Sequence, residues 1–224
     1  MYGFKLKIIG DYACFTRPEM KVERVSYDVP TPSAIRGIIE SIYWHPSIKY
    51  KIDKIYVMNP IKFMNIRRNE VKEKASYRNI KDLMNGKDID ASIYRDENIS
   101  QRASMILKDV CYYVEAHYEM TGINGDDSNK VIAILSKRLK IGQYFKVPVL
   151  GCREFPAIIE QVDEIPSSQL HGEIDLGYML YDMKFRKGKK AEQYSNTADA
   201  MFYRPMMVDG MIDVAKYAPK EDIL

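Results

Sequence analysis

The first residues alternate between apolar and polar side chains. The apolar members are Phe4, Leu6 and Ile8, and a lysine follows each of the first two. A period of two indicates a strand that buries one face. We therefore predict a strand over residues 4–12.

A helical spacing begins after an irregular stretch. Thr31 suits the N-cap position and Pro32 the first helical position. Isoleucines then recur at i, i+3, i+4 and i+7, which predicts a single apolar face formed by Ile35, Ile38, Ile39 and Ile42. We predict a helix from Pro32 to about Trp44, ending before Pro46.

Further strands and a second helix follow. β-Branched and aromatic residues predict strands at residues 52–58, 61–66, 105–120, 147–150 and 156–162. Asp127 or Ser128 suits the N-cap of a helix that runs to Gly142, whose type is favoured at C′. This order predicts an α+β fold with the split βαβ arrangement of ferredoxin-like, or RRM-like, domains.

Two regions depart from this order. Residues 70–102 are polar and have no clear period, which predicts an arm or long hairpin that projects from the body. After Pro166 the pattern changes to short strands at 176–185 and 206–214, with the basic run 186–190 between them. We expect a ferredoxin-like RNA-binding domain at 1–165 and a small antiparallel β-sheet module at 166–224.

The composition is that of a folded globular protein. The 224 residues are 46% hydrophobic and 29% charged, and 34 Lys and Arg against 31 Asp and Glu leave a net charge of only +3. Nucleic-acid binding would therefore need local clustering of charge. The three cysteines contain no Cys-x-x-Cys pair, which indicates a reducing compartment. Without a membrane-length apolar stretch or a signal-peptide pattern, we expect a cytoplasmic protein with no membrane contact.

The common cofactor and metal motifs are missing from the sequence. It contains no Gly-x-Gly-x-x-Gly, no Walker-type loop and no His-Glu-x-x-His. We therefore expect no cofactor, and we interpret Asp126 and Asp127 as turn and cap residues rather than metal ligands.

The end of the first predicted helix is a candidate site. At 100° per residue Tyr43 lies about 20° around the helix from Arg36, so a phenol and a guanidinium would share one border. Tyr43 is then either an ordinary aromatic that closes the core, or a phenol placed beside positive charge to exchange a proton.

The second predicted helix carries a basic side. Lys130 falls in its first turn, where a cation opposes the helix dipole, and Lys137 and Arg138 extend the same surface. This surface would suit a phosphate, although a solvated lysine is the commoner explanation. Further basic residues stand among tyrosines, an arrangement that suits single-stranded RNA unless the charges are simply solvated. The predicted RNA-binding residues among them are Lys21, Arg24, Arg36, Arg67 and Arg68.

Several longer runs point to one family. The sequence resembles the CRISPR-associated Cas-five family of subtype I-C at residues 10–27 (GDYACFTRPEMKVERVSY), 29–33 (VPTPS), 42–44 (IYW), 66–71 (IRRNEV), 115–117 (EAH), 150–156 (LGCREFP) and 175–179 (DLGYM). The resemblance implies a ferredoxin-like domain that binds CRISPR repeat RNA and cleaves the precursor at the base of the repeat hairpin without a metal. It also implies that the protein stays on the 5′ handle beside the other surveillance-complex subunits, and we expect a monomer in isolation.

The resemblance also implies two catalytic residues. The family's tyrosine corresponds to Tyr43 and its lysine to Lys130. The family histidine that follows the lysine is replaced by Val131, which cannot transfer a proton. In the expected mechanism a ribose 2′-OH attacks the adjacent phosphorus, and the leaving oxygen takes a proton from Lys130, water or His117.

Two alternatives remain open at this stage. Because of Val131, the chain could be a subunit that holds the 5′ handle and cuts weakly or not at all. A ferredoxin-like metabolic enzyme that acts on a small phosphorylated substrate is the third possibility, and it would lack RNA affinity.

Overall fold

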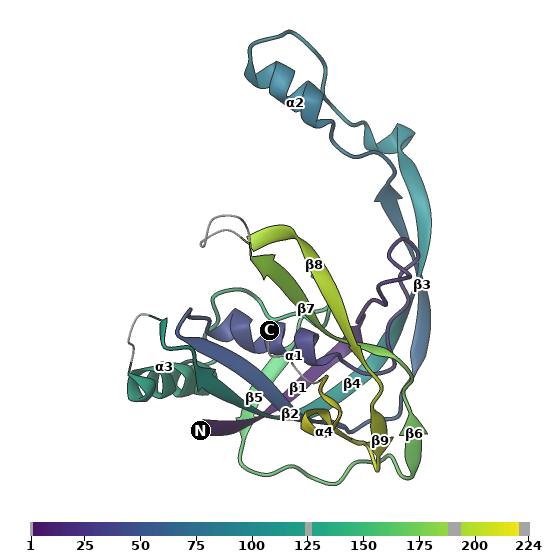
Figure 1. The fold of residues 1–224 in the computed structure, drawn as a ribbon. Coiled ribbons are helices and arrows are strands. Elements are labelled where there is room, and N and C mark those ends of the chain that lie inside the picture. Colours follow the sequence, from purple (N-terminus) through teal and green to yellow (C-terminus); the bar gives the residue numbers. More distant parts are fainter. Residues whose placement is uncertain (1, 124–126, 188–193, 220–224) are drawn as a thin grey trace.

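A curved, antiparallel sheet forms the body of the molecule, and an arm projects from it (Figure 1). The computed structural model describes residues 2–123, 127–187 and 194–219. The predicted mixture of helices and a mostly antiparallel sheet is confirmed. No helix within these described ranges is long and apolar enough to cross a membrane.

Four strands form the centre of the sheet, in the order β5, β1, β4, β2, and each pairs antiparallel with its neighbours. They are β1 (Tyr2–Ala13), β2 (Ile48–Val57), β4 (Ile99–Met120) and β5 (Ile158–Val162). The predicted alternation in β1 is confirmed, because Phe4, Leu6 and Ile8 are buried.

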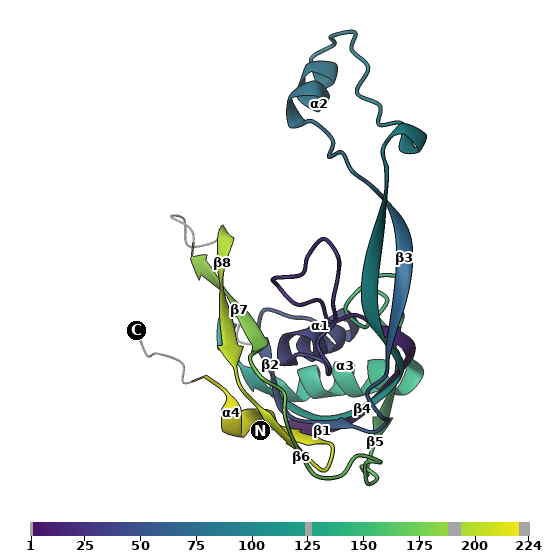
Figure 2. The same ribbon diagram turned by 90° about the vertical axis from the view of Figure 1, so that its right-hand side faces the viewer.

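Two helices cover one face of this sheet (Figure 2). In α1 (Pro32–Ile42) the Thr31 side chain accepts a hydrogen bond from the Ala34 amide, and the isoleucine face is buried as predicted. The second helix, α3 (Ser128–Ile141), is capped by Asp127, ends at Gly142 and also buries its apolar face. The prediction that α1 reaches Trp44 is wrong, since the helix ends at Ile42.

The arm is a two-stranded ribbon with a helix beyond it (Figure 1). The strand β3 (Phe63–Val71) pairs with the first part of β4, and the ribbon continues into α2 (Tyr77–Met84) and the short 3-10 helix η1 (Arg95–Glu97). Both strands extend further into the arm than predicted. The outer residues of β3, 67–71, are exposed or half-buried on both faces, so no hydrophobic period marked them as part of the predicted strand.

The last quarter of the chain contributes both to the central sheet and to a separate two-stranded sheet. Three short strands, β6 (Glu173–Asp175), β9 (Met206–Val208) and β10 (Met211–Asp213), extend the central sheet through the pairing of β10 with β2. Lys54, Ile55 and Tyr56 of β2 thereby gain a partner strand on the side away from β4. The remaining strands, β7 (Met179–Lys187) and β8 (Tyr194–Tyr203), form a separate hairpin, and α4 (Val214–Tyr217) follows β10.

One predicted strand is absent, and two predictions fall outside the described residues. No strand covers residues 147–150, where the backbone makes only an isolated bridge between Val149 and Pro156. Part of the basic run at 186–190 and Asp126 lie outside the described residues.

Candidate nucleic-acid interface and active site

Tyr43 is the C-cap residue of α1 and lies at the junction between helix and loop. Its backbone is extended, with φ −149° and ψ 116°, and only 8% of its surface is exposed. The Tyr50 hydroxyl of β2 donates a hydrogen bond of 2.8 Å to the Tyr43 carbonyl. Burial raises the pKa of Tyr50, so this hydroxyl remains a donor. This hydrogen bond therefore holds the backbone of Tyr43 against the sheet.

The cation beside Tyr43 is Arg138 of α3. Its guanidinium carbon lies 5.0 Å from the centre of the Tyr43 ring, and its Nη1 donates a hydrogen bond of 2.7 Å to the Ile42 carbonyl. The predicted pairing with Arg36 assumed that α1 continues through Tyr43. Because the helix ends at Ile42, Tyr43 departs from the helical wheel and meets the other helix instead.

Arg36 contacts the β7–β8 hairpin. Its guanidinium forms a two-pronged ion pair with Asp182, one contact being 2.8 Å long, and lies 3.3 Å from Glu40. Burial alone would lower the pKa of Arg36, but the hydrogen bond and charge of Asp182 outweigh burial and raise it. Its positive charge is thus already compensated, which does not favour the RNA contact predicted for it.

Lys130 lies in the first turn of α3 and is exposed, as the sequence predicted. Tyr118 connects this end of α3 to Tyr43: its hydroxyl contacts Ser128, and its ring packs edge-on against Tyr50. Tyr43 and Lys130 therefore lie on the same, helix-covered side of the sheet. The guanidinium of Arg138 and the imidazole of His45 contact the Tyr43 ring. Within the described residues, Lys130 makes no such contact with that ring.

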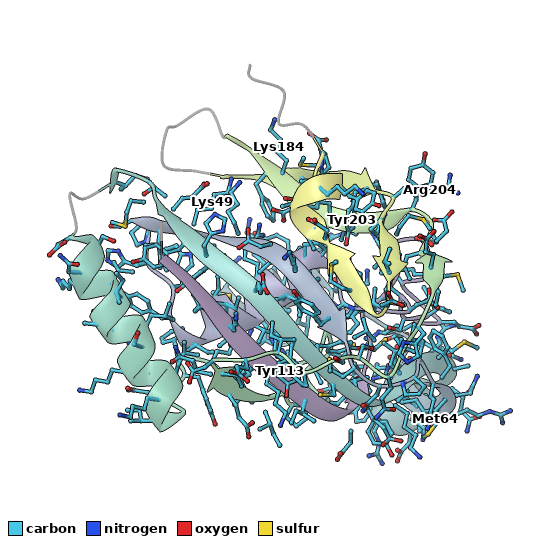
Figure 3. The ribbon with its side chains drawn as sticks, turned by 90° about the horizontal axis from the view of Figure 1, so that it is seen from below. Lys49, Met64, Tyr113, Lys184, Tyr203 and Arg204 are labelled. Atoms are coloured by element: carbon cyan, nitrogen blue, oxygen red, sulfur yellow. The ribbon has the colours of Figure 1, made fainter. Side chains whose placement is uncertain are left out.

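His117 lies on the opposite face of the sheet. Its neighbours in β4, Ala116 and Tyr118, are buried on the helix side, so the alternation turns His117 away from it. Its Nδ1 is 2.8 Å from an Asp53 carboxylate oxygen. Figure 3 looks onto this side, with Tyr113 of the same strand in view. His117 is therefore separated from Tyr43 by the sheet.

His45 belongs with Tyr43, and the sequence analysis missed it. The two rings are nearly parallel, at 12°, with centroids 6.4 Å apart. The His45 Nδ1 lies 3.0 Å from the Ser47 Oγ. The signal was present in the sequence, because His45 follows Tyr43 by two residues in an Ile-Tyr-Trp-His run. We call Tyr43, His45, Lys130 and Arg138 the Tyr43 site.

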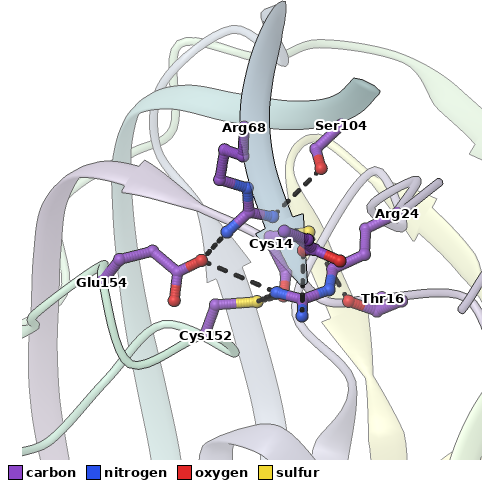
Figure 4. A network of polar contacts seen from close by, with 8 residues as sticks. Cys14, Thr16, Arg24, Arg68, Ser104, Cys152 and Glu154 are labelled. Carbon is purple, nitrogen blue, oxygen red and sulfur yellow. Dashed lines mark hydrogen bonds and ion pairs between the residues drawn. The ribbon is translucent and has the colours of Figure 1, made fainter. Parts of the chain in front are cut away.

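A second cluster of predicted RNA-binding residues lies at the base of the arm (Figure 4). Arg68 of β3 pairs with Glu154 and donates a hydrogen bond of 3.0 Å to Ser104. Arg24 lies 3.6 Å from Glu154 and 3.6 Å from Glu70. We call these residues, with Cys14 and Cys152, the arm-base network. Its arginines join three segments that are far apart in the sequence.

Two cysteines belong to the same network. The Cys152 Sγ lies 3.6 Å from a guanidinium nitrogen of Arg24 and 3.8 Å from the Cys14 carbonyl oxygen. A hydrogen bond with Cys14 and the nearby positive charge of Arg24 lower the pKa of Cys152, although burial opposes this. The pKa of Cys14 is raised by that same hydrogen bond and by burial.

Other predicted RNA-binding side chains are exposed. Lys21, Arg67 and Lys137 all reach the surface, and within the described ranges none of them lies within 4.0 Å of a carboxylate. Nor do the described residues contain a group of three or more His, Cys, Asp or Glu side chains that could hold a metal ion.

Comparison with known proteins identifies the family. The model of the CRISPR-associated Cas5 family, in its Cas5d form, matches residues 3–215. The chain belongs to the Cas5 family. It is 46% identical over 227 residues to a protein of Mannheimia succiniciproducens named CRISPR pre-crRNA endoribonuclease Cas5d, covering 97% of this chain and 96% of that one.

A second relative agrees with this membership. A Thermus thermophilus protein of the same name is 41% identical over 186 residues, which cover 83% of this chain and 75% of that protein. A crystal structure described as a CRISPR-associated protein superposes with a TM-score of 0.65 at 22% identity, covering 95% of this chain and 91% of the other. This likeness shows that the two chains share a fold.

Val131, the residue that the resemblance placed where the family has a histidine, is buried. Only 2% of its surface is exposed, and it packs in the same core as Leu135 and Leu139. Its side chain points into the core rather than towards solvent, so Val131 is not an exposed part of the Tyr43 site.

Proposed function

We propose that this Cas5 protein binds the repeat of a CRISPR precursor RNA, cleaves it without a metal ion at the base of the repeat hairpin, and keeps the 5′ handle as a type I-C surveillance-complex subunit. The observation that carries this proposal is the 46% identity, over 97% of the chain, to a protein named as a pre-crRNA endoribonuclease. The names of both relatives do not support the non-cleaving alternative based on Val131. These names likewise give no support to the alternative of a metabolic enzyme that acts on a small phosphorylated substrate.

The proposed reaction is attack by a ribose 2′-oxygen on the adjacent phosphorus. Tyr43 is the proton acceptor for the 2′-hydroxyl, and Lys130 stabilises the negative charge of the phosphorane. The common side of the sheet and the contacts through Tyr50, Tyr118 and Ser128 support a joint role for the two residues. The sequence also offered His117 as the proton donor, but its place on the other face does not favour it.

The domain organisation is part of the proposal. The order β1, α1, β2, β4, α3, β5 and the sheet order β5, β1, β4, β2 support a ferredoxin-like domain over residues 1–165 that carries the arm at about 70–102. The remaining residues, 166–224, extend its sheet and add the β7–β8 hairpin. In this proposal the exposed Lys21, Arg67 and Lys137 contact RNA phosphates. Arg24, Arg36, Arg68 and Arg138, which have protein partners, mainly hold the interface in shape.

The test is cleavage of cognate repeat RNA by the purified protein in EDTA, with mapping of the product ends. We expect one cut that leaves a 2′,3′-cyclic phosphate. The matched substrate has a single 2′-deoxy nucleotide at the scissile position, and it should bind with similar affinity but remain whole. Cutting of the deoxy substrate, or a requirement for Mg²⁺, would refute the mechanism.

A further inference from the structure

The proposed reaction lacks a proton donor for the leaving oxygen. The usual solution is a histidine, because its charge changes near neutral pH. The position of the family histidine is occupied by Val131, which is buried, and His117 faces the other side of the sheet. One imidazole remains on the side of Tyr43, and it belongs to His45.

The loop that carries His45 is held firmly. Ser47 is fully buried, and its carbonyl accepts a hydrogen bond of 2.8 Å from the Thr121 amide. The Thr121 hydroxyl donates a hydrogen bond of 2.7 Å to the Pro46 carbonyl. Both hydrogen bonds come from Thr121, which directly follows β4, so they tie the loop to the end of that strand. His45 is thus presented on a fixed turn beside the end of α1.

Ser47 holds the imidazole of His45 at its Nδ1. The Ser47 Oγ lies 3.0 Å from this nitrogen, and the Ser47 amide donates a hydrogen bond of 3.4 Å to it. The Ser47 hydroxyl also donates a hydrogen bond of 2.9 Å to the Ile123 carbonyl, which holds Ser47 itself in place. The ring of His45 is therefore fixed through Nδ1, and Nε2 is the nitrogen that faces away from Ser47.

His45 also opens onto a groove of suitable character. The groove, about 870 Å³ in volume, runs between α1, the start of β2 and the β7–β8 hairpin. Its lining includes His45, Trp44, which is 62% exposed, and Lys184 of the hairpin, which is marked in Figure 3. An exposed aromatic and a lysine in one groove suit a single-stranded nucleotide that stacks its base on the ring and directs its phosphate to the cation.

We propose that His45 is the general acid of this site and protonates the leaving 5′-oxygen of an RNA strand bound in the groove. This inference rests on the proposed function. As the 2′-oxygen bonds to phosphorus, the bond between phosphorus and the 5′-oxygen breaks and its electron pair stays on that oxygen. The Nε2 proton of His45 passes to it, which gives a 5′-hydroxyl, a 2′,3′-cyclic phosphate and a neutral imidazole. After the products leave, the phenol of Tyr43 loses the proton it took and the imidazole of His45 regains one, each by exchange with bulk water.

The experiment compares two leaving groups in the full-length protein. Repeat RNA with the natural linkage is tested beside the same RNA in which sulfur replaces the scissile 5′-oxygen, because a thiolate leaves without an acid. We expect His45→Gln to cut the natural RNA about 10² to 10⁴ times more slowly and the sulfur-substituted RNA at nearly the wild-type rate. The exposed His171 provides the matched control, and His171→Gln should cut both substrates like the wild type.

Each result decides between the alternatives. Equal slowing of His45→Gln on both RNAs, or no slowing on either, would overturn the role of His45 while wild-type cleavage upholds the proposed function. If the wild type fails to cut the natural RNA, both proposals fall. His45→Asn, with RNA affinity and thermal unfolding measured alongside, provides a second variant if His45→Gln is poorly folded. The assignment would also be contradicted if sulfur substitution restored the cleavage rate of His117→Gln but not that of His45→Gln.

Discussion

The Tyr43 site and the arm-base network both contain arginines beside aromatic or sulfur side chains, but they use their charge differently. In the arm-base network Glu154 and Glu70 face the guanidinium groups of Arg24 and Arg68. At the Tyr43 site the charged groups of Lys130 and Arg138 meet no carboxylate within 4.0 Å among the described residues. Basic residues close in sequence therefore do not by themselves predict a phosphate contact. The fold decides whether such a residue can bind phosphate, because a carboxylate placed beside it neutralises its charge.

The largest expected contrast is in cleavage. Tyr43→Phe keeps the ring and its contacts with Arg138 and His45 but removes the proton acceptor. We expect the rate of precursor cleavage to fall by about 10² to 10⁴ with little change in RNA affinity, whereas Arg68→Gln should leave the rate within a few-fold. Single-turnover kinetics on one RNA measure both. Equal loss in the two variants would remove the distinction between the regions.

The next contrast concerns stability at the Tyr43 site. Arg138→Met retains the aliphatic stem but loses the charged hydrogen bond to the Ile42 carbonyl and the contact with the Tyr43 ring. We expect a loss of about 2 kcal/mol in the free energy of unfolding, measured by urea denaturation. Lys137→Met, which alters an exposed neighbour in the same helix, is the control and should change stability by less than about 0.5 kcal/mol. Similar losses in both would show that Arg138 does not brace the site.

The arm-base network makes a prediction about thiol chemistry. The pKa of Cys152 is lowered, so at pH 7 a larger share is thiolate than for Cys111, whose pKa is raised by burial. We expect iodoacetamide to modify Cys152 several-fold faster than Cys111, with the difference shrinking as pH rises and both ionise. Arg24→Gln should slow the reaction at Cys152. Mass spectrometry of the labelled peptides follows both sites, and faster labelling of Cys111 at pH 7 would contradict the assignment.

The smallest contrast is in the salt dependence of RNA binding. Removing one phosphate contact to a single strand lowers the slope of log K against log salt by about 0.7. We expect Lys137→Gln to show this change and Arg68→Gln to show almost none, because Glu154 already neutralises Arg68. Titrations at several salt concentrations measure the slopes. A larger change for Arg68→Gln would mean that RNA displaces Glu154.

Local patterns were sufficient for most of the body. The isoleucine spacing of α1, the cap at Asp127 and the alternation in β1 depend on neighbours within a few residues, so periodicity predicted them. Tyr43 and Lys130 were found by their positions at helix ends together with the family resemblance. Their catalytic roles remain predictions.

Long-range pairings were not visible in the sequence. The pairing of β10 with β2 and the ion pair between Arg68 and Glu154 join distant segments whose local composition does not name the partner. The cation beside Tyr43 was misassigned for the same reason, since α1 ends two residues before the predicted Trp44 and the phenol lies beside Arg138 instead. His45 was missed because an imidazole gains meaning only from what its ring meets in space.

The length of β4 gives the arm a mechanical property. This single strand is shared by the arm and by the centre of the sheet: β3 pairs with its residues 99–107, and its pairing with β1 begins at Leu107. At about 3.3 Å per residue, the eight steps from Ile99 to Leu107 make a lever of roughly 26 Å. A one-degree rotation at Leu107 thus moves the outer end of the ribbon by about 0.5 Å. Conversely, a load on the arm is transmitted as torque to the strand that lies between β1 and β2.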